Sequence, residues 1–227
     1  MPCQAALRSL IVLGNKMHIE PGYLSAAKIA LANTAAIALA GSQLIHLVRQ
    51  PRLAVRVLLA ALFFSLCMQL VHVPVGPSEL HLLGAMPIYL TLGLLPALLG
   101  FGLGLLLQGL LFEPADLVHL GVNFLSLALP LLAVHAAFGR HLRRVDPRTL
   151  LKLDAAFYGG VTLMVGFWLA LGETATPLAA WAGFAASYAS VAIAEPLLTW
   201  LALRGVARVA GRPLGRLCFD TRFCSAA

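Results

Sequence analysis

The sequence is poor in charged residues. Of its 227 residues, only 11% are Asp, Glu, Lys or Arg, whereas 60% are hydrophobic. A soluble domain carries about 25% charged residues, which cover its water-facing surface. This shortage excludes a soluble protein and predicts an integral membrane protein. Long apolar runs occupy almost the whole chain, so no sizeable domain outside the membrane is expected.

Cysteines and acidic residues are also scarce. Cys218 and Cys224 are six residues apart and have no partner pair, which fits no common zinc spacing, so free thiols are expected. Nine acidic residues stand against 16 basic ones, for a net charge of +7. The basic residues lie between the apolar runs, where they report membrane orientation. We therefore expect the lipid bilayer, and not nucleic acid, as the partner of these charges.

The apolar runs predict an all-α helical bundle with about seven membrane segments. Each crossing needs about 20 mostly apolar residues. The stretch 82–112 is too long for one crossing, and Gly93 and Pro96 near its middle predict two short helices joined by a tight turn. The expected segments are at about 27–47, 54–73, 82–96, 97–112, 118–138, 154–171 and 177–203.

The positive charges predict the orientation. Thirteen of the 16 Lys and Arg residues lie in 49–56, 140–152 and 204–222. Seven crossings bring all three regions to one face, which the positive-inside rule makes cytoplasmic, whereas six crossings would separate the first two. We expect an inner (plasma) membrane protein of bacterial type, with its N-terminus outside, a transmembrane domain at 17–204 and a basic cytoplasmic tail at 205–227.

Residues 1–16 conflict with this orientation, because they place Arg8 and Lys16 outside. We expect that Met17 is the true start or that this extension is removed. A free amine at Met17 would join the peptide nitrogen and the imidazole Nδ1 of His18 in two fused chelate rings. Such planar nitrogen sets suit Ni(II) or Cu(II). The nitrogen of Met17 is a free amine only if no residue precedes it. This site therefore requires a chain that begins at Met17.

A fourth nitrogen would come from elsewhere in the fold. His81 is the best candidate, because it starts the predicted helix 82–96 on the same side of the membrane as Met17. A histidine in this place is otherwise a capping or interfacial residue.

Three polar residues stand out inside the predicted membrane helices. Glu195 is either functional, as an intramembrane carboxylate is by default, or bonds the backbone freed by Pro196. Asn123 and Gln108 are uncharged and could tie neighbouring helices together. The glycines at 100, 102 and 104 follow no strand, so they predict close helix packing and not a phosphate loop.

Several motifs resemble one membrane protein family. MHIEPGYL from Met17 and SELHLLGA around His81 are similar to the start and a loop of the CbiM/NikM family. HLGVNFLSLALP and AIAEPLLTW resemble two of its later helices, and the resemblance covers 17–204. These proteins are the metal-specific membrane components of energy-coupling-factor (ECF) cobalt and nickel ABC transporters.

The resemblance implies a substrate site closed by the N-terminus, which threads into the bundle. Met17 would give its amine, His18 its amide and imidazole nitrogens, and His81 the fourth ligand. Glu20 would orient His18, although the acidic residue of the family lies one position later. Asn123 would structure the site loops.

The resemblance also bears on the last helix. The family places a glutamate at the position of Glu195, though not as a direct ligand. Many members have a histidine one and a half to two turns earlier, where this chain has Tyr188.

The implied function is the capture of Ni²⁺ or Co²⁺ as transported substrate, with no organic cofactor and no enzymatic activity. Separate ATPase subunits would hydrolyse ATP, and a transmembrane coupling subunit would link them to this chain. One alternative is an ECF component for a vitamin-like molecule, which would need a larger pocket with aromatic or polar walls. Another is an intramembrane enzyme, but the sequence contains neither HExxH nor GxSxG, and we expect no paired carboxylates within the membrane.

Overall fold

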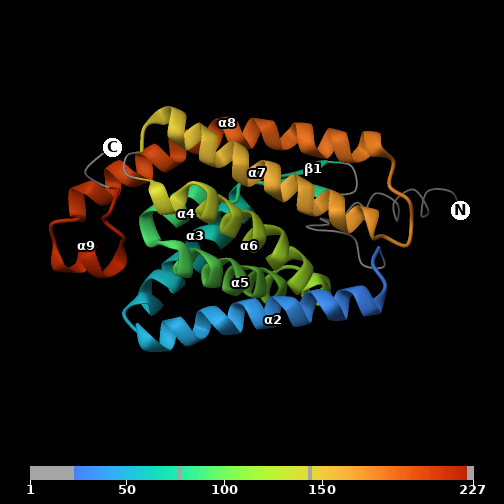
Figure 1. The fold of residues 1–227 in the computed structure, drawn as a ribbon, viewed down its shortest axis with the longest axis horizontal. Helices are drawn as coiled ribbons and strands as arrows, with labels where there is room; N and C mark the ends of the chain where they lie inside the picture. The colour runs from blue at the N-terminus through green and yellow to red at the C-terminus, as the bar shows by residue number, and fades with distance from the viewer. Residues whose placement is uncertain (1–22, 76–77, 143–144, 224–227) are drawn as a thin grey trace, which may run out of the picture.

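The computed structural model describes residues 23–75, 78–142 and 145–223, which form a bundle of helices with one small hairpin (Figure 1). The elements in chain order are α2 (Ala26–Arg49), α3 (Leu53–Leu70), β1 (His72–Val75), β2 (Ser78–His81), α4 (Ala85–Leu92), α5 (Leu94–Leu111), η1 (Pro114–His119), α6 (Leu120–Ala137), η2 (Gly139–His141), α7 (Pro147–Ala170), α8 (Leu178–Val209) and α9 (Pro213–Cys218). The predicted all-α class is confirmed. The antiparallel hairpin β1–β2 was not predicted.

Six of the described helices are long and apolar enough to cross a membrane: α2, α3, α5, α6 with the preceding η1, α7 and α8. The remaining expected segment, 82–96, corresponds to α4, which has only eight residues. An α-helix of that length spans about 12 Å, less than half of a hydrocarbon core of about 30 Å. The predicted count of seven crossing helices is therefore not confirmed.

The predicted break in 82–112 is confirmed at Gly93. This residue separates α4 from α5 and has a φ of 100°, which L side chains rarely adopt. The glycine run in α5 also has the predicted packing role. A Cβ at position 100 would collide with Ala60, and one at position 104 with Phe64.

Helices α3 and α5 run in the same direction. Gly100 packs against Ala60, and farther along both helices Gln108 donates to the backbone oxygen of Ser65 at 2.9 Å. The chain must therefore return through the bundle between the end of α3 and the start of α5. Residues 82–92, which include α4, make this return.

Contacts at both ends of the returning segment fix its path. At one end, the amide of Leu82 donates to Val71, just after α3, at 3.2 Å. At the other end, the carbonyl of Thr91 accepts from the amide of Asp220, beyond α9, at 2.6 Å. Residues 82–92 thus connect the hairpin end of the bundle to the end that carries the C-terminal segment (Figure 1).

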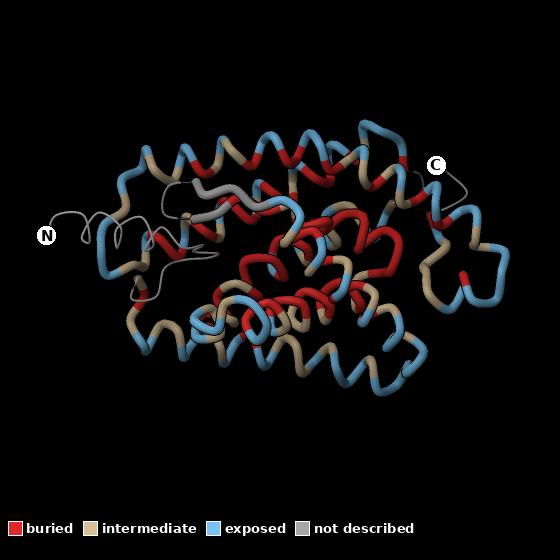
Figure 2. Tube along the Cα trace, turned by 180° about the vertical axis from the view of Figure 1, so that it is seen from behind, coloured by how far each residue is buried: buried red, intermediate tan, exposed pale blue. Residues whose placement is uncertain are grey.

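Burial is concentrated in the central helices (Figure 2). All eight residues of α4 are buried. In the 24-residue α2, only Ala32 and Ala36 are buried, and large side chains such as Leu31 and Ile37 are exposed. A helix with such an exposed apolar surface fits a lipid environment, whereas α4 forms part of the core.

Candidate functional site

Glu195 is completely buried in the middle of α8 and accepts hydrogen bonds from two other parts of the chain. The amide of Met86 donates to Oε1 at 2.9 Å, and the amide of Gly84 donates to Oε2 at 3.1 Å. The hydroxyl of Tyr158 on α7 donates to Oε2 as well. The first amides of a helix have no partner within it, so this carboxyl group caps α4 from a neighbouring helix.

The cap fixes a backbone turn. Gly84 has a φ of 62°, and a Cβ there would lie 2.7 Å from Cε1 of Phe63. Glycine is required by both the conformation and the space. His81 lies three residues before this turn, so Glu195 holds the segment that leads from His81 into α4.

A second carboxyl group, Asp154 on α7, lies beside Glu195 and is also completely buried. This pair contradicts the expectation that the membrane helices hold no paired carboxylates. The sequence analysis did not single out Asp154. Its position in an otherwise apolar helical segment was the signal that would have identified it.

His81 is the last residue of β2 and is only 3% exposed. The hydroxyl of Tyr188 lies within hydrogen-bonding reach of its backbone. Tyr188 in turn stacks on Tyr158, with ring centroids 5.3 Å apart. The two tyrosines therefore connect the backbone of His81 to the Glu195 carboxyl group.

The first described residues are anchored at the same end of the bundle. The backbone oxygen of Tyr23 accepts from the amide of Glu173 at 2.9 Å, and its hydroxyl bonds to Thr176. Leu24 is buried. The chain thus enters the fold beside the turn between α7 and α8.

An ion pair closes this turn over α2. The Nζ atom of Lys28 lies 2.7 Å from Oε1 of Glu173 and also donates to the carbonyl of Leu171 at 2.7 Å. The hydrogen bond and the positive charge of Lys28 lower the pKa of the exposed Glu173 carboxyl group. The N-terminal end of α2 is thereby tied to the segment that anchors Tyr23.

The predicted site residues are placed as follows. His81 and Glu195 are brought into one neighbourhood, while Met17, His18 and Glu20 lie outside the described residues. Asn123 on α6 is half-buried and makes no hydrogen bond to the described part of the chain. Within that same part, no three His, Cys, Asp or Glu side chains form a group that could hold a metal ion.

A different asparagine ties helices together. Oδ1 of Asn33 on α2 accepts from the amide of Gly121 at 2.8 Å, and its Nδ2 donates to Val118 at 3.2 Å. Asn33 thereby caps the start of α6, which sequence reasoning missed. Helix tying is instead confirmed for Gln108, which also accepts from Gln69 at 2.6 Å.

Comparison with known proteins agrees with this architecture. The model of a family described as the cobalt uptake substrate-specific transmembrane region, CbiM, matches residues 18–212. A solved structure described as the crystal structure of a transition metal transporter has a similar fold, with a TM-score of 0.64. The match covers 87% of this chain and 96% of that chain at 21% identity. No curated protein is significantly similar in sequence. The chain belongs to the CbiM family of cobalt uptake substrate-specific transmembrane regions.

Proposed function

We propose that this protein captures Ni²⁺ or Co²⁺ as the substrate-specific component of an ECF-type ABC transporter. Four nitrogens would bind the ion: the amine of Met17, the amide and imidazole nitrogens of His18, and the imidazole of His81. The observation that carries the proposal is the burial of His81 in a segment fixed by Glu195. A deeply buried imidazole on a fixed backbone suits a nickel or cobalt ligand.

The anchoring of Tyr23 supports the contribution of Met17 and His18. Its backbone and side chain hold the chain at the α7–α8 turn only five residues after His18. Five residues reach at most about 18 Å when extended. This reach supports a site at the end of the bundle at which the hairpin and Tyr23 lie.

We propose indirect roles for three polar residues. Glu195 positions His81 by capping α4, and Glu20 orients the His18 ring. Asn123 structures the neighbouring loops. Groups that orient ligands typically contribute 10- to 100-fold to metal affinity.

The direction of the helices supports seven passages through the membrane. Because α3 and α5 are parallel, residues 82–92 act as a short return passage inside the bundle. The basic regions 49–56, 140–152 and 204–222 then share the cytoplasmic face. The N-terminus and the metal site lie outside, where the ion is taken up.

The partners follow from the family. We propose that a transmembrane coupling subunit and separate ATPases complete the complex in the inner membrane, because metal uptake against a gradient needs an energy source. In this arrangement the chain itself binds the ion and hydrolyses no ATP.

Calorimetric titration of the purified chain that begins at Met17 with NiCl₂ and CoCl₂ tests the site. The His81→Ala variant should lose more than about 100-fold in affinity, because it removes a ligand and not only an orienting group. Its melting temperature without metal should match that of the wild type, since the amides of Gly84 and Met86 keep their acceptor.

His46→Ala is the matched control, because it removes an exposed histidine near the opposite end of α2. This variant should bind as tightly as the wild type. Unchanged affinity in His81→Ala, or an equal loss in His46→Ala, would contradict the proposed site.

A further inference from the structure

A cavity lined by four arginines lies where the α2–α3 connection meets the C-terminal segment. It has a volume of about 920 Å³. Arg49 ends α2, Arg52 and Arg56 lie at the start of α3, and Arg216 belongs to α9. The remaining lining residues, such as Leu53 and Leu217, are uncharged. The cavity thus combines a high positive charge with an apolar wall.

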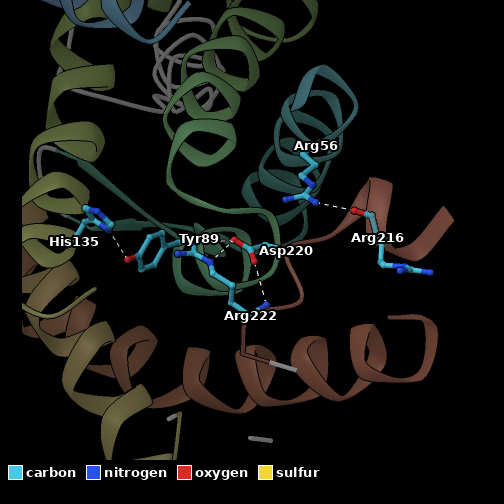
Figure 3. Close-up of polar contacts among 6 residues, drawn as sticks. All are labelled: Arg56, Tyr89, His135, Arg216, Asp220 and Arg222. Atoms are coloured by element: carbon cyan, nitrogen blue, oxygen red, sulfur yellow. Dashed lines mark hydrogen bonds and ion pairs between the residues drawn. The ribbon is translucent and has the colours of Figure 1, made fainter. Parts of the chain in front are cut away.

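The positive charge is not neutralised within the described chain. No carboxylate among the described residues forms an ion pair with any of the four arginines. Asp220, the nearest acidic residue along the C-terminal segment, pairs instead with Arg222 at 2.8 Å (Figure 3). Four uncompensated guanidinium groups around one cavity attract an anion.

The backbone around the cavity is held in place by one of these arginines. Nε of Arg56 donates to the carbonyl of Leu217 at 3.0 Å, and Nη2 donates to the carbonyl of Arg216 at 2.8 Å (Figure 3). These bonds fix the C-terminal segment against α3. The side chains of Arg49, Arg52 and Arg216 are exposed to the cavity side of the protein and remain available.

An apolar groove adjoins this contact. It has a volume of about 430 Å³ and is lined by α3, α4, α8 and Phe219. Leu59, one turn after Arg56, lines the groove, as Phe219 does two residues after Leu217. The same two segments therefore line both the arginine cavity and the apolar groove. A ligand that fits both has an anionic head and a hydrocarbon chain.

We propose that this site binds one anionic phospholipid of the cytoplasmic leaflet. Its phosphate lies among Arg49, Arg52 and Arg216, and an acyl chain lies in the groove between α3 and α8. Basic pockets between membrane helices suit lipid headgroups of this kind. The proposal goes beyond metal capture and uses the proposed orientation only to choose the leaflet.

Native mass spectrometry of the full chain in a neutral detergent measures the binding. Phosphatidylglycerol and phosphatidylcholine with identical acyl chains serve as probes. The wild type should retain one phosphatidylglycerol in clear preference to phosphatidylcholine. The double variant Arg52→Gln/Arg216→Gln should lose about 30-fold in phosphatidylglycerol affinity, the effect of two arginines near a lipid phosphate. Equal retention of the two lipids by the wild type would overturn the proposal.

Arg140→Gln/Arg148→Gln is the matched control, since it removes two exposed arginines of the same face away from the cavity. It should keep the lipid preference. An equal loss in both double variants would assign the preference to the basic face in general and overturn the site. An unchanged preference in the cavity variant would also overturn it and favour a protein partner for these arginines.

The groove is tested separately with Gly205→Leu. Gly205 lines the groove, and a Cβ there meets no atom within 4 Å, so the helix accepts a side chain that fills the space. The variant should weaken phosphatidylglycerol binding but leave any binding of glycerol 3-phosphate unchanged. If glycerol 3-phosphate displaces the lipid completely and Gly205→Leu has no effect, the site holds a soluble phosphate and the lipid assignment fails. When the same substitutions are made in the chain that begins at Met17, its Ni²⁺ affinity should be unchanged, which separates this test from that of the metal site.

Discussion

Helices α2 and α4 are both apolar, yet their surroundings are opposite. All eight residues of α4 are buried, whereas α2 buries only two of its 24. Helix α2 can cross a bilayer by its own length, while α4 cannot. The difference shows that hydrophobicity has two uses in this chain. The apolar side chains of α2 suit contact with lipid. Those of α4 pack in the core, so that the segment after His81 can pass through the protein interior to the opposite end of the bundle.

The tethers at the two ends of α4 make this comparison testable. At the start of α4, Glu195 accepts hydrogen bonds from the amides of Gly84 and Met86. In its last turn, the carbonyl of Thr91 accepts from the amide of Asp220. No described residue of another helix makes a hydrogen bond to the interior backbone of α2. Substitutions that remove the tethers of α4 should therefore lower the stability of the protein, whereas substitutions in α2 should not.

The largest effect is expected from Glu195→Ala. It leaves the amides of Gly84 and Met86 and the hydroxyl of Tyr158 without a partner in the protein interior, which costs about 3–5 kcal/mol. Thermal unfolding in detergent should show a large fall in melting temperature. Glu195→Gln keeps one acceptor oxygen, so its loss should be clearly smaller. Equal melting temperatures for the wild type and Glu195→Ala would refute the tether.

Phe223→Ala tests the other end of α4. Phe223 is buried at the end of the described C-terminal segment, and its truncation should cost about 3 kcal/mol. Leu214→Ala removes a side chain from α9 that is 71% exposed, and it should leave the melting temperature unchanged. If both variants melt like the wild type, the C-terminal segment does not hold α4.

A pair of glycine substitutions compares the two helices directly. Gly84→Ala places a Cβ against Phe63 at a φ of 62°, which should cost about 1–3 kcal/mol. Gly41→Ala lies in α2, where a Cβ meets no atom within 4 Å, and it should stabilise the protein by up to about 1 kcal/mol. Chemical unfolding of the two variants gives both values. If both substitutions changed the free energy of unfolding in the same direction, the comparison of α4 with α2 would be contradicted.

The smallest effect concerns the ion pair that ties α2 to the α7–α8 turn. Because Lys28 lowers the pKa of Glu173, the stabilisation is present above the ordinary carboxyl range and is lost as the pH falls through the lowered value. The wild type should melt slightly above Glu173→Gln at pH 7, and this difference should shrink as the pH falls below the ordinary carboxyl range. High salt should also reduce it, because the pair is exposed. A difference that grows in acid would contradict this interpretation.

Much of this fold was predictable, because long apolar runs and their charged borders determine where membrane helices begin and end. The break at Gly93 was predicted from a local rule about glycine. The length of α4 was not predictable, since an apolar stretch has the same composition whether lipid or protein surrounds it. The hairpin at 72–81 was missed because it pairs two short segments that follow a helix without a marked alternation.

The site was predictable only in part. His81 and Glu195 were singled out because polar residues near or within apolar helices are conspicuous. Their connection through Tyr158 and Tyr188 was not predictable, because tyrosine is common in such helices. Asp154 was missed although a carboxyl group in an apolar helical segment is equally conspicuous. Asn33 was not predictable, because its partners lie on another helix and one sequence contains no information about which helices touch.

The central claim is tested most directly by titrating two purified chains with Ni²⁺ and Co²⁺, one beginning at Met1 and one at Met17, with the intact mass of each recorded. We expect tight binding only by chains that begin at Met17, and loss of that binding in the His81→Ala variant of such a chain. Equal, tight binding by the chain with residues 1–16 intact would show that the amine is not a ligand and would contradict the account.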